Sequence, residues 1–178
     1  NVFNSPYEHA IALCKEIVHS KIKARFQTIE LNPAFIDDTL FVAMEEAGFV
    51  GVGVTAESAE DGVLRGLGKS YTAQDIRRAA EVVARHKIPC FWLFLLGGPN
   101  ETPQSVEETF QFAKKFIRPS DTVFFNIGIR IYPGTELEKI ARRQGVLKVP
   151  AEEMLKPVFY ISPEVDKDWL TKKLKREI

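Results

Sequence analysis

The sequence predicts an α/β protein with a parallel β-sheet or barrel, and three observations lead to this prediction. Short β-favourable runs alternate with segments of helical periodicity along most of the chain. The run Cys90–Leu96 is apolar at every position, which is typical of a strand covered on both faces. With 178 residues, 45% of them hydrophobic, the chain can form the core of one globular domain.

The chain opens with a predicted helix and a predicted strand. Ser5 is expected to cap the helix, with Pro6 at its first position and Glu8 completing a capping box. The β-favourable segment Phe26–Leu31 follows and is stopped by an Asn-Pro pair. The inward positions of the helix are spaced as on one helical face: Ala10, Leu13, Cys14 and Ile17.

A second helix and a second strand come next. Gly48 ends the helix, and Val50–Thr55 is the strand. Gly51 and Gly53 leave one face of this strand without side chains, which fits the close packing of a helix as well as a ligand. The apolar positions of the helix recur at helical spacing: Ile36, Leu40, Ala43, Met44 and Ala47.

Two more helix and strand pairs follow. The helix before the third strand begins at Thr72, where Asp75 completes a capping box, and the helix after it begins with Thr102 as cap. The fourth strand is predicted at Thr122–Tyr132, and a last helix ends at Gly145.

The segment after Gly145 is ambiguous. "PVFYIS" can form a strand, and Asp166 to Glu177 can form a solvated helix. We therefore divide the chain into residues 1–145, which carry the strand and helix alternation, and a C-terminal extension, residues 146–178.

Composition narrows the class of protein. The formal net charge is zero, so nothing suggests nucleic acid or an acidic membrane surface as a partner. The longest apolar run has the length of a strand, and no signal peptide or membrane span is predicted. Cys14 and Cys90 lie on apolar segments far apart, so they read as inert core thiols and fit a reducing, cytoplasmic compartment.

Polar residues gather where the predicted strands end. In parallel β/α folds, ligands bind beyond the carboxyl ends of the strands. The first two strands end near Glu30 and at Glu57–Ser58, and the third ends at Gly97–Gly98–Pro99. The fourth carries Arg130 and ends at Tyr132. Carboxylates, a glycine pair and a cation are therefore expected at the same edge of the sheet, where the parallel strands end.

Each of these features also has an ordinary structural explanation. Glu30 could be a solvated strand end, and Glu57 an acid at a helix start with Ser58 as its cap. The Gly97–Gly98–Pro99 segment could be a simple turn, and Arg130 a salt-bridge partner for one of the acids.

Taken together, four segments resemble the radical S-adenosylmethionine (radical SAM) enzymes. The segments "TIELNP", "TAESAEDGVLRGLGKSYT", "LLGGPNETPQSVEET" and "RIYPGT" occur in the order and at the separations seen in that family. The likeness is to the branch often joined to a cobalamin-binding domain, and to methylthiotransferases and anaerobic coproporphyrinogen oxidase. It implies an α/β fold that is the C-terminal part of a (β/α)6 partial TIM barrel, from the end of strand 2 to helix 6.

The resemblance also implies roles for individual residues. Glu30 matches a carboxylate that accepts hydrogen bonds from the ribose hydroxyls of S-adenosylmethionine. Glu57, with Ser58 beside it, matches a polar position on the next strand, and Lys69 matches a basic partner of the methionine carboxylate. The segment Gly97–Gly98–Pro99 matches a motif beside the adenine, where missing side chains let the backbone approach the cofactor. Arg130 could face the cofactor, the substrate or another side chain.

Two departures from the family pattern stand out. Several relatives have aspartate where Leu93 stands, and others have glycine in place of Phe94. The family's C-x-x-x-C-x-x-C motif, which holds a [4Fe–4S] cluster, does not occur in this sequence, and Cys14 and Cys90 cannot replace it. The chain also begins without methionine in the middle of a pattern, which favours an excised piece of a longer enzyme over a degenerate homologue.

We therefore expect part of the catalytic domain of a radical SAM enzyme. The parent enzyme would cleave S-adenosylmethionine reductively or, with cobalamin from an upstream domain, transfer a methyl group to a substrate that this sequence does not identify. The alternatives are a non-catalytic β/α binding module and an unrelated barrel enzyme that uses Glu30 and Glu57 as acid and base. The piece alone should be inactive and bind no cluster, and its uncovered first strand should favour a homodimer or self-packing of the N-terminal segment.

Overall fold

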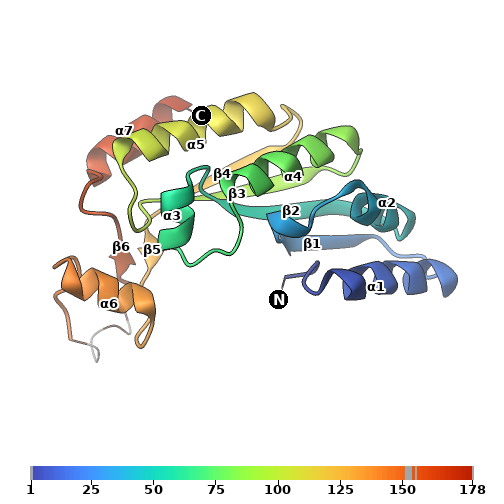
Figure 1. Ribbon diagram of the computed structural model, residues 1–178, viewed down its shortest axis with the longest axis horizontal. Helices are drawn as coiled ribbons and strands as arrows, with labels where there is room; N and C mark the ends of the chain where they lie inside the picture. The colour runs from blue at the N-terminus through green and yellow to red at the C-terminus, as the bar shows by residue number, and fades with distance from the viewer. Residues whose placement is uncertain (1, 151–153, 155, 178) are drawn as a thin grey trace.

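A four-stranded parallel sheet forms the centre of the molecule (Figure 1). The computed structural model describes residues 2–150, 154 and 156–177. The strands follow one another in chain order, which confirms the predicted parallel sheet with sequential neighbours. They are β1 (Phe26–Leu31), β2 (Phe49–Glu57), β3 (Cys90–Leu96) and β4 (Thr122–Ile127).

Helices cover one side of this sheet. In Figure 1, α1, α2, α4 and α5 follow one another around the sheet from the lower right to the top, and α7 lies beside α5. None of the helices in the described part of the chain is long and apolar enough to cross a membrane. The helices are α1 (Tyr7–His19), α2 (Asp38–Glu46), α3 (Asp61–Gly66), α4 (Ala73–Arg85), α5 (Pro103–Phe116), α6 (Glu136–Arg143) and α7 (Lys167–Glu177), with a short 3-10 helix η1 (Pro33–Phe35).

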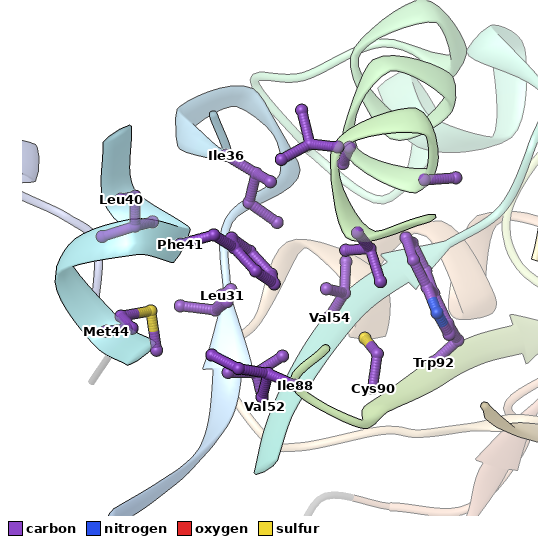
Figure 2. Packing of buried hydrophobic residues seen from close by; sticks show 14 of the residues in the cluster. Leu31, Ile36, Leu40, Phe41, Met44, Val52, Val54, Ile88, Cys90 and Trp92 are labelled. Atoms are coloured by element: carbon purple, nitrogen blue, oxygen red, sulfur yellow. The ribbon is translucent and has the colours of Figure 1, made fainter. Parts of the chain in front are cut away.

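The main core lies between the sheet and the helices α1, α2, α4 and α5 (Figure 2). Alternate residues of β3 are buried on this side, among them Trp92 and Phe94, which are fully buried. The other face of the sheet, which the helices do not cover, is called the inner face. Its side chains are only partly covered: Phe91 remains 37% exposed and Phe124 48% exposed. The apolar run of β3 is therefore covered completely on one face and partly on the other.

Several predicted helix starts are confirmed, and one is wrong. Thr72 and Thr102 each accept a hydrogen bond from the backbone three residues on, within a capping box. Ser5 does not cap α1, because Pro6 occupies the cap position in an extended conformation and the helix has no side-chain cap. Leu13 is also not part of the buried stripe, since it is 41% exposed while Ala10, Cys14 and Ile17 are buried.

The glycines of β2 make room for a neighbouring strand. A Cβ atom on Gly53 would lie 2.4 Å from the carbonyl oxygen of Ile29, and one on Gly51 would lie 3.2 Å from Nε2 of Gln27. Both neighbours belong to β1, whose pairing with β2 is irregular between Thr28 and Leu31. The missing side chains therefore serve the packing of an adjacent strand, rather than the packing of a helix.

The fourth strand ends earlier than predicted. β4 stops at Ile127 because Gly128 adopts a left-handed conformation, with φ of 80°, that turns the chain out of the sheet. The next residues form β5 (Ile129–Arg130), which pairs antiparallel with β6 (Phe159–Tyr160) from the C-terminal extension. The possible strand in "PVFYIS" and the possible helix after Asp166 therefore both form. Figure 1 shows β5, β6 and α6 at one end of the molecule, beyond the sheet.

Candidate functional site

An ion pair lies at the carboxyl end of β2. Nζ of Lys69 lies 2.5 Å from Oε1 of Glu57, whose side chain is only 5% exposed. A pairing irregularity between Thr55 and Glu57 precedes this end, and Glu57 has a positive φ of 66°, which is uncommon for a residue with a side chain. The glutamate is therefore held in a strained conformation, as residues at functional sites often are.

Glu30 and Lys69 line one small cavity at the ends of β1 and β2. The cavity has a volume of about 170 Å³. Glu30 is half-buried, and Phe3 donates its backbone N–H to the carbonyl oxygen of Glu30 over 3.1 Å. The other lining residues come from the N-terminal segment, the end of β1, β2 and the loop after α3: Val2, Leu31, Asn32, Thr55, Gly68, Ser70 and Tyr71.

Tyr71, which lines this cavity, is close to two carboxylates: Glu30 also lines the cavity, and Glu57 is paired with Lys69 beside it. Burial raises the pKa of Tyr71, and the negative charges of Glu57 and Glu30 raise it further, so the phenol stays protonated and donates to the carbonyl oxygen of Thr55. Oε2 of Glu57 and Oγ1 of Thr55 are buried without a hydrogen-bond partner. Unsatisfied buried polar atoms are uncommon in folded proteins.

The glycine segment after β3 is held by a carboxylate that the sequence analysis did not single out. Oε2 of Glu101 accepts hydrogen bonds from the backbone N–H groups of both Gly97 and Gly98, and Glu101 is fully buried. Burial raises the pKa of this carboxyl to about 7, although the two backbone donors act in the opposite direction. The feature of the sequence that could have identified Glu101 is its position: it is an acid three residues after the glycine pair and directly before Thr102, the cap of the next helix.

Protein side chains occupy the space that Gly97 and Gly98 leave open. A Cβ atom on Gly97 would lie 3.2 Å from Cγ2 of Ile161, and one on Gly98 would lie 3.3 Å from Cγ1 of Val63. Pro99 is buried, and its carbonyl oxygen lies close to Gly66 of α3. The glycine segment thus packs between α3 and the C-terminal extension, and none of its residues lines the cavity with Glu30 and Lys69.

Ser58 and Arg130 lie away from that cavity. Ser58 is fully buried, with its hydroxyl 3.4 Å from that of Thr109 on α5, and it does not cap α3, because Glu60 does so by accepting from Val63. The alternative that Glu57 begins a helix is therefore wrong. Arg130 is exposed and stacks over the ring of Tyr132 at 4.7 Å, with no carboxylate paired to it in the described part of the chain.

The cysteines do not fit an iron–sulfur cluster. Cys14 is buried on α1 and Cys90 is buried at the amino end of β3, the end opposite to the cavity. Burial raises the pKa of both thiols, whereas cluster ligands are thiolates. Across residues 2–150, 154 and 156–177, no three His, Cys, Asp or Glu side chains are placed to hold a metal ion.

Comparison with known proteins gives the family of this chain. The model of the radical SAM superfamily matches residues 3–113. The chain is 34% identical, over 105 residues, to an uncharacterised methyltransferase of Pyrococcus horikoshii, and this match covers 59% of the chain and 22% of the relative.

Solved structures share the fold at low sequence identity. The radical SAM methyltransferase TsrM of Kitasatospora setae, whose structure has cobalamin and a [4Fe–4S] cluster bound, matches 100% of this chain with a TM-score of 0.82 at 21% identity. Coproporphyrinogen III oxidase (HemN) of Escherichia coli, a radical SAM enzyme, matches 84% of the chain with a TM-score of 0.55 at 15% identity. The chain spans 42% of TsrM and 31% of HemN. By the match of the family model to more than half of its residues, this chain belongs to the radical SAM superfamily.

Proposed function

We propose that this chain forms part of the catalytic domain of a radical SAM enzyme and holds part of the S-adenosylmethionine site. The observation that carries the proposal is the convergence of Glu30 and Lys69 on one cavity, with Glu57 bonded to the lysine beside it. The cavity lies at the carboxyl ends of parallel strands, where ligands of such folds bind.

The chemistry of these side chains suits the cofactor. The carboxylate of Glu30 can accept hydrogen bonds from both ribose hydroxyls. The ammonium of Lys69 has three N–H donors and uses one on Glu57, so it can also bind the methionine carboxylate of the ligand. Glu57 would then act by holding the lysine in place at the strand end.

The size of the cavity supports contact with part of the cofactor. Ligand pockets for molecules of this class usually have volumes of ~300–1,000 Å³, whereas the cavity beside Glu30 has about 170 Å³. We propose that it accepts the ribose and its neighbouring groups. The remaining contacts would come from the inner face of the sheet and from residues outside this chain.

The parent protein would cleave S-adenosylmethionine reductively to a 5′-deoxyadenosyl radical, or transfer a methyl group with cobalamin bound to an upstream domain. The cobalamin bound to TsrM supports the second activity. A [4Fe–4S] cluster supplies the electron in this family, and cysteines outside this chain would hold it. The two buried, unpaired cysteines support a cytoplasmic location. The substrate stays unidentified.

The two alternative functions have less support. Membership of the superfamily argues against an unrelated barrel enzyme with Glu30 and Glu57 as acid and base. Glu57 is also engaged by Lys69, which leaves it poorly placed as a general base. A non-catalytic binding module would require that the parent protein has lost the cysteine motif, and the parent reading frame shows whether it has.

The test uses the longest protein that contains this chain, purified without oxygen and reconstituted with iron and sulfide. We measure 5′-deoxyadenosine and S-adenosylhomocysteine formed under a low-potential reductant. Glu30→Gln should raise the KM for S-adenosylmethionine by about tenfold or more, the cost of a charged hydrogen bond. Glu46→Gln, an exposed acid on α2, is the matched control and should behave as the unchanged protein. Equal KM values for Glu30→Gln and the control would overturn the proposal.

A further inference from the structure

The N-terminal segment, residues 2–4, is bonded to the end of β1. The backbone N–H of Phe3 donates to the carbonyl oxygen of Glu30 over 3.1 Å. Oδ1 of Asn4 accepts from the backbone N–H of Asn32 over 2.8 Å, and Nδ2 of Asn4 donates to the carbonyl oxygen of Asn32 over 3.0 Å. Asn32 directly follows β1 and keeps an extended backbone. The segment therefore bonds to two alternate residues, 30 and 32, as a neighbouring strand would.

The side chain of Asn4 takes the place of a peptide group in this pairing. A carboxamide offers an oxygen acceptor and N–H donors, as the backbone does. Nδ2 of Asn4 also donates to the carbonyl oxygen of Phe35 in η1 over 2.9 Å, and the side chain is fully buried. On the other side of β1, Leu31 pairs with Val54 of β2. The end of β1 is thus held by β2 on one side and by Asn4 on the other.

The backbone that Asn4 holds forms a wall of the cavity beside Lys69. Val2, Glu30, Leu31 and Asn32 all line this cavity. In the described part of the chain, the carboxylate of Glu30 is bonded to no other side chain. The place of this carboxylate in the cavity therefore depends on the backbone at the end of β1.

We propose that Asn4 is a positioning residue that sets the carboxylate of Glu30 in the cavity at the end of β1. This inference rests on the proposed function, in which Glu30 binds S-adenosylmethionine. Asn4 itself would not touch the cofactor, because it is fully buried and does not line the cavity. Its loss should let the end of β1 move and weaken cofactor binding through Glu30, while the chemical step is kept.

The first measurement is hydrogen exchange of the parent protein without cofactor. In Asn4→Ala, the amides of Phe3 and Asn32 should exchange about tenfold faster, as expected for the loss of one net hydrogen bond. Ser105→Ala is the matched control: its hydroxyl is also buried and bonds within the cap of α5, so its loss leaves the end of β1 in place. Equal exchange of these two amides in both variants would show that Asn4 does not hold the end of β1.

The second measurement is a double-mutant cycle in the reconstituted parent protein. Asn4→Ala should raise the KM for S-adenosylmethionine about fivefold with kcat nearly unchanged, and Ser105→Ala should leave both constants unchanged. In the Glu30→Gln background, Asn4→Ala should raise KM by less than about twofold, because the carboxylate that it positions is already lost. If Asn4→Ala does not fold, Asn4→Asp replaces it, since it keeps the volume and the acceptor for Asn32 and loses both donors.

The cycle separates the two proposals. If Glu30→Gln raises KM and the Asn4 variant does not, the positioning role is wrong and the proposed site stands. An equal rise in KM from the Asn4 variant in both backgrounds would also overturn the positioning role, because the effect would not pass through Glu30. If neither Glu30→Gln nor the Asn4 variant raises KM, the proposed site itself is wrong.

Discussion

Lys69 and Glu57 form an ion pair across the end of β2, with 2.5 Å between Nζ and Oε1. The pair is asymmetric, because the lysine side chain is 30% exposed while that of the glutamate is 5% exposed. The second carboxylate oxygen of Glu57 is buried and unpartnered. The charge of the glutamate is therefore compensated mainly by one lysine, and this dependence can be measured.

Lys69→Met should destabilise the protein by about 3 kcal/mol at neutral pH, since it leaves Glu57 buried without its counter-ion. Adding Glu57→Gln should restore much of that loss, and urea unfolding of both variants gives the comparison. In the control, Lys139→Met removes an exposed pair with Glu136 and should cost less than about 1 kcal/mol. If Lys69→Met and Lys139→Met lower the free energy of unfolding equally, the buried pair stabilises the protein no more than the exposed pair does.

Gly53→Ala should destabilise the sheet by about 1–3 kcal/mol, because the new methyl group would lie 2.4 Å from the carbonyl oxygen of Ile29. Gly51→Ala is the matched control. Its methyl group would meet the flexible side chain of Gln27 at 3.2 Å, which can move aside. Urea unfolding should show a lower midpoint for Gly53→Ala alone, and the reverse order would contradict the assigned register of β1 and β2.

Stability should fall as the pH rises from about 4.5 to about 7, through the carboxyl of Glu101. Burial raises its pKa in the folded protein from 4.5 to about 7, so the unfolded chain loses this proton first. The protonated carboxyl of Glu101 therefore stabilises the folded protein fully below about pH 4.5, and this stabilisation is lost above about pH 7. Its size is on the order of 3 kcal/mol.

The check for Glu101 is urea unfolding at pH 5 and pH 7.5. Glu101→Gln keeps an oxygen acceptor for Gly97 and Gly98 and should remove most of this pH dependence. Glu138 is an informative comparison: bonds from Gly134 and Arg142 lower its pKa, so it favours stability at higher pH. An unchanged pH dependence in Glu101→Gln would place the titrating group elsewhere.

The chain should associate through the free side of β1. In the described residues β1 is the first strand of the sheet, with a neighbour on one side, and Ile29 on it is 87% exposed. Self-packing also occurs, since α1 packs against α2 and Phe3 bonds to Glu30. The homodimer stays a prediction: light scattering should show that Ile29→Lys shifts the chain toward the monomer. Val42→Lys, an exposed apolar position on α2, should not, and the same mass for all variants would refute the edge contact.

The order and type of the main elements could be predicted from the sequence. Helical and strand periodicity are local properties, and the caps at Thr72 and Thr102 depend on residues three positions apart. The strand ends then placed Glu30 and Glu57 at one edge of the sheet, because the ends of parallel strands meet there. Lys69 was singled out only through the resemblance to a family, and its ion pair with Glu57 was not predicted from the sequence.

Tertiary structure decided what the glycines are for. From the sequence taken alone, Gly97 and Gly98 are more typical of a turn than of a ligand site, and Gly53 fits the packing of a helix as well as a ligand. Which atoms fill a missing side chain's space depends on residues distant in the chain, such as Ile161 against Gly97 and Ile29 against Gly53. The buried carboxyl of Glu101 was hidden for the same reason: its burial and its raised pKa come from packing, which no local pattern records.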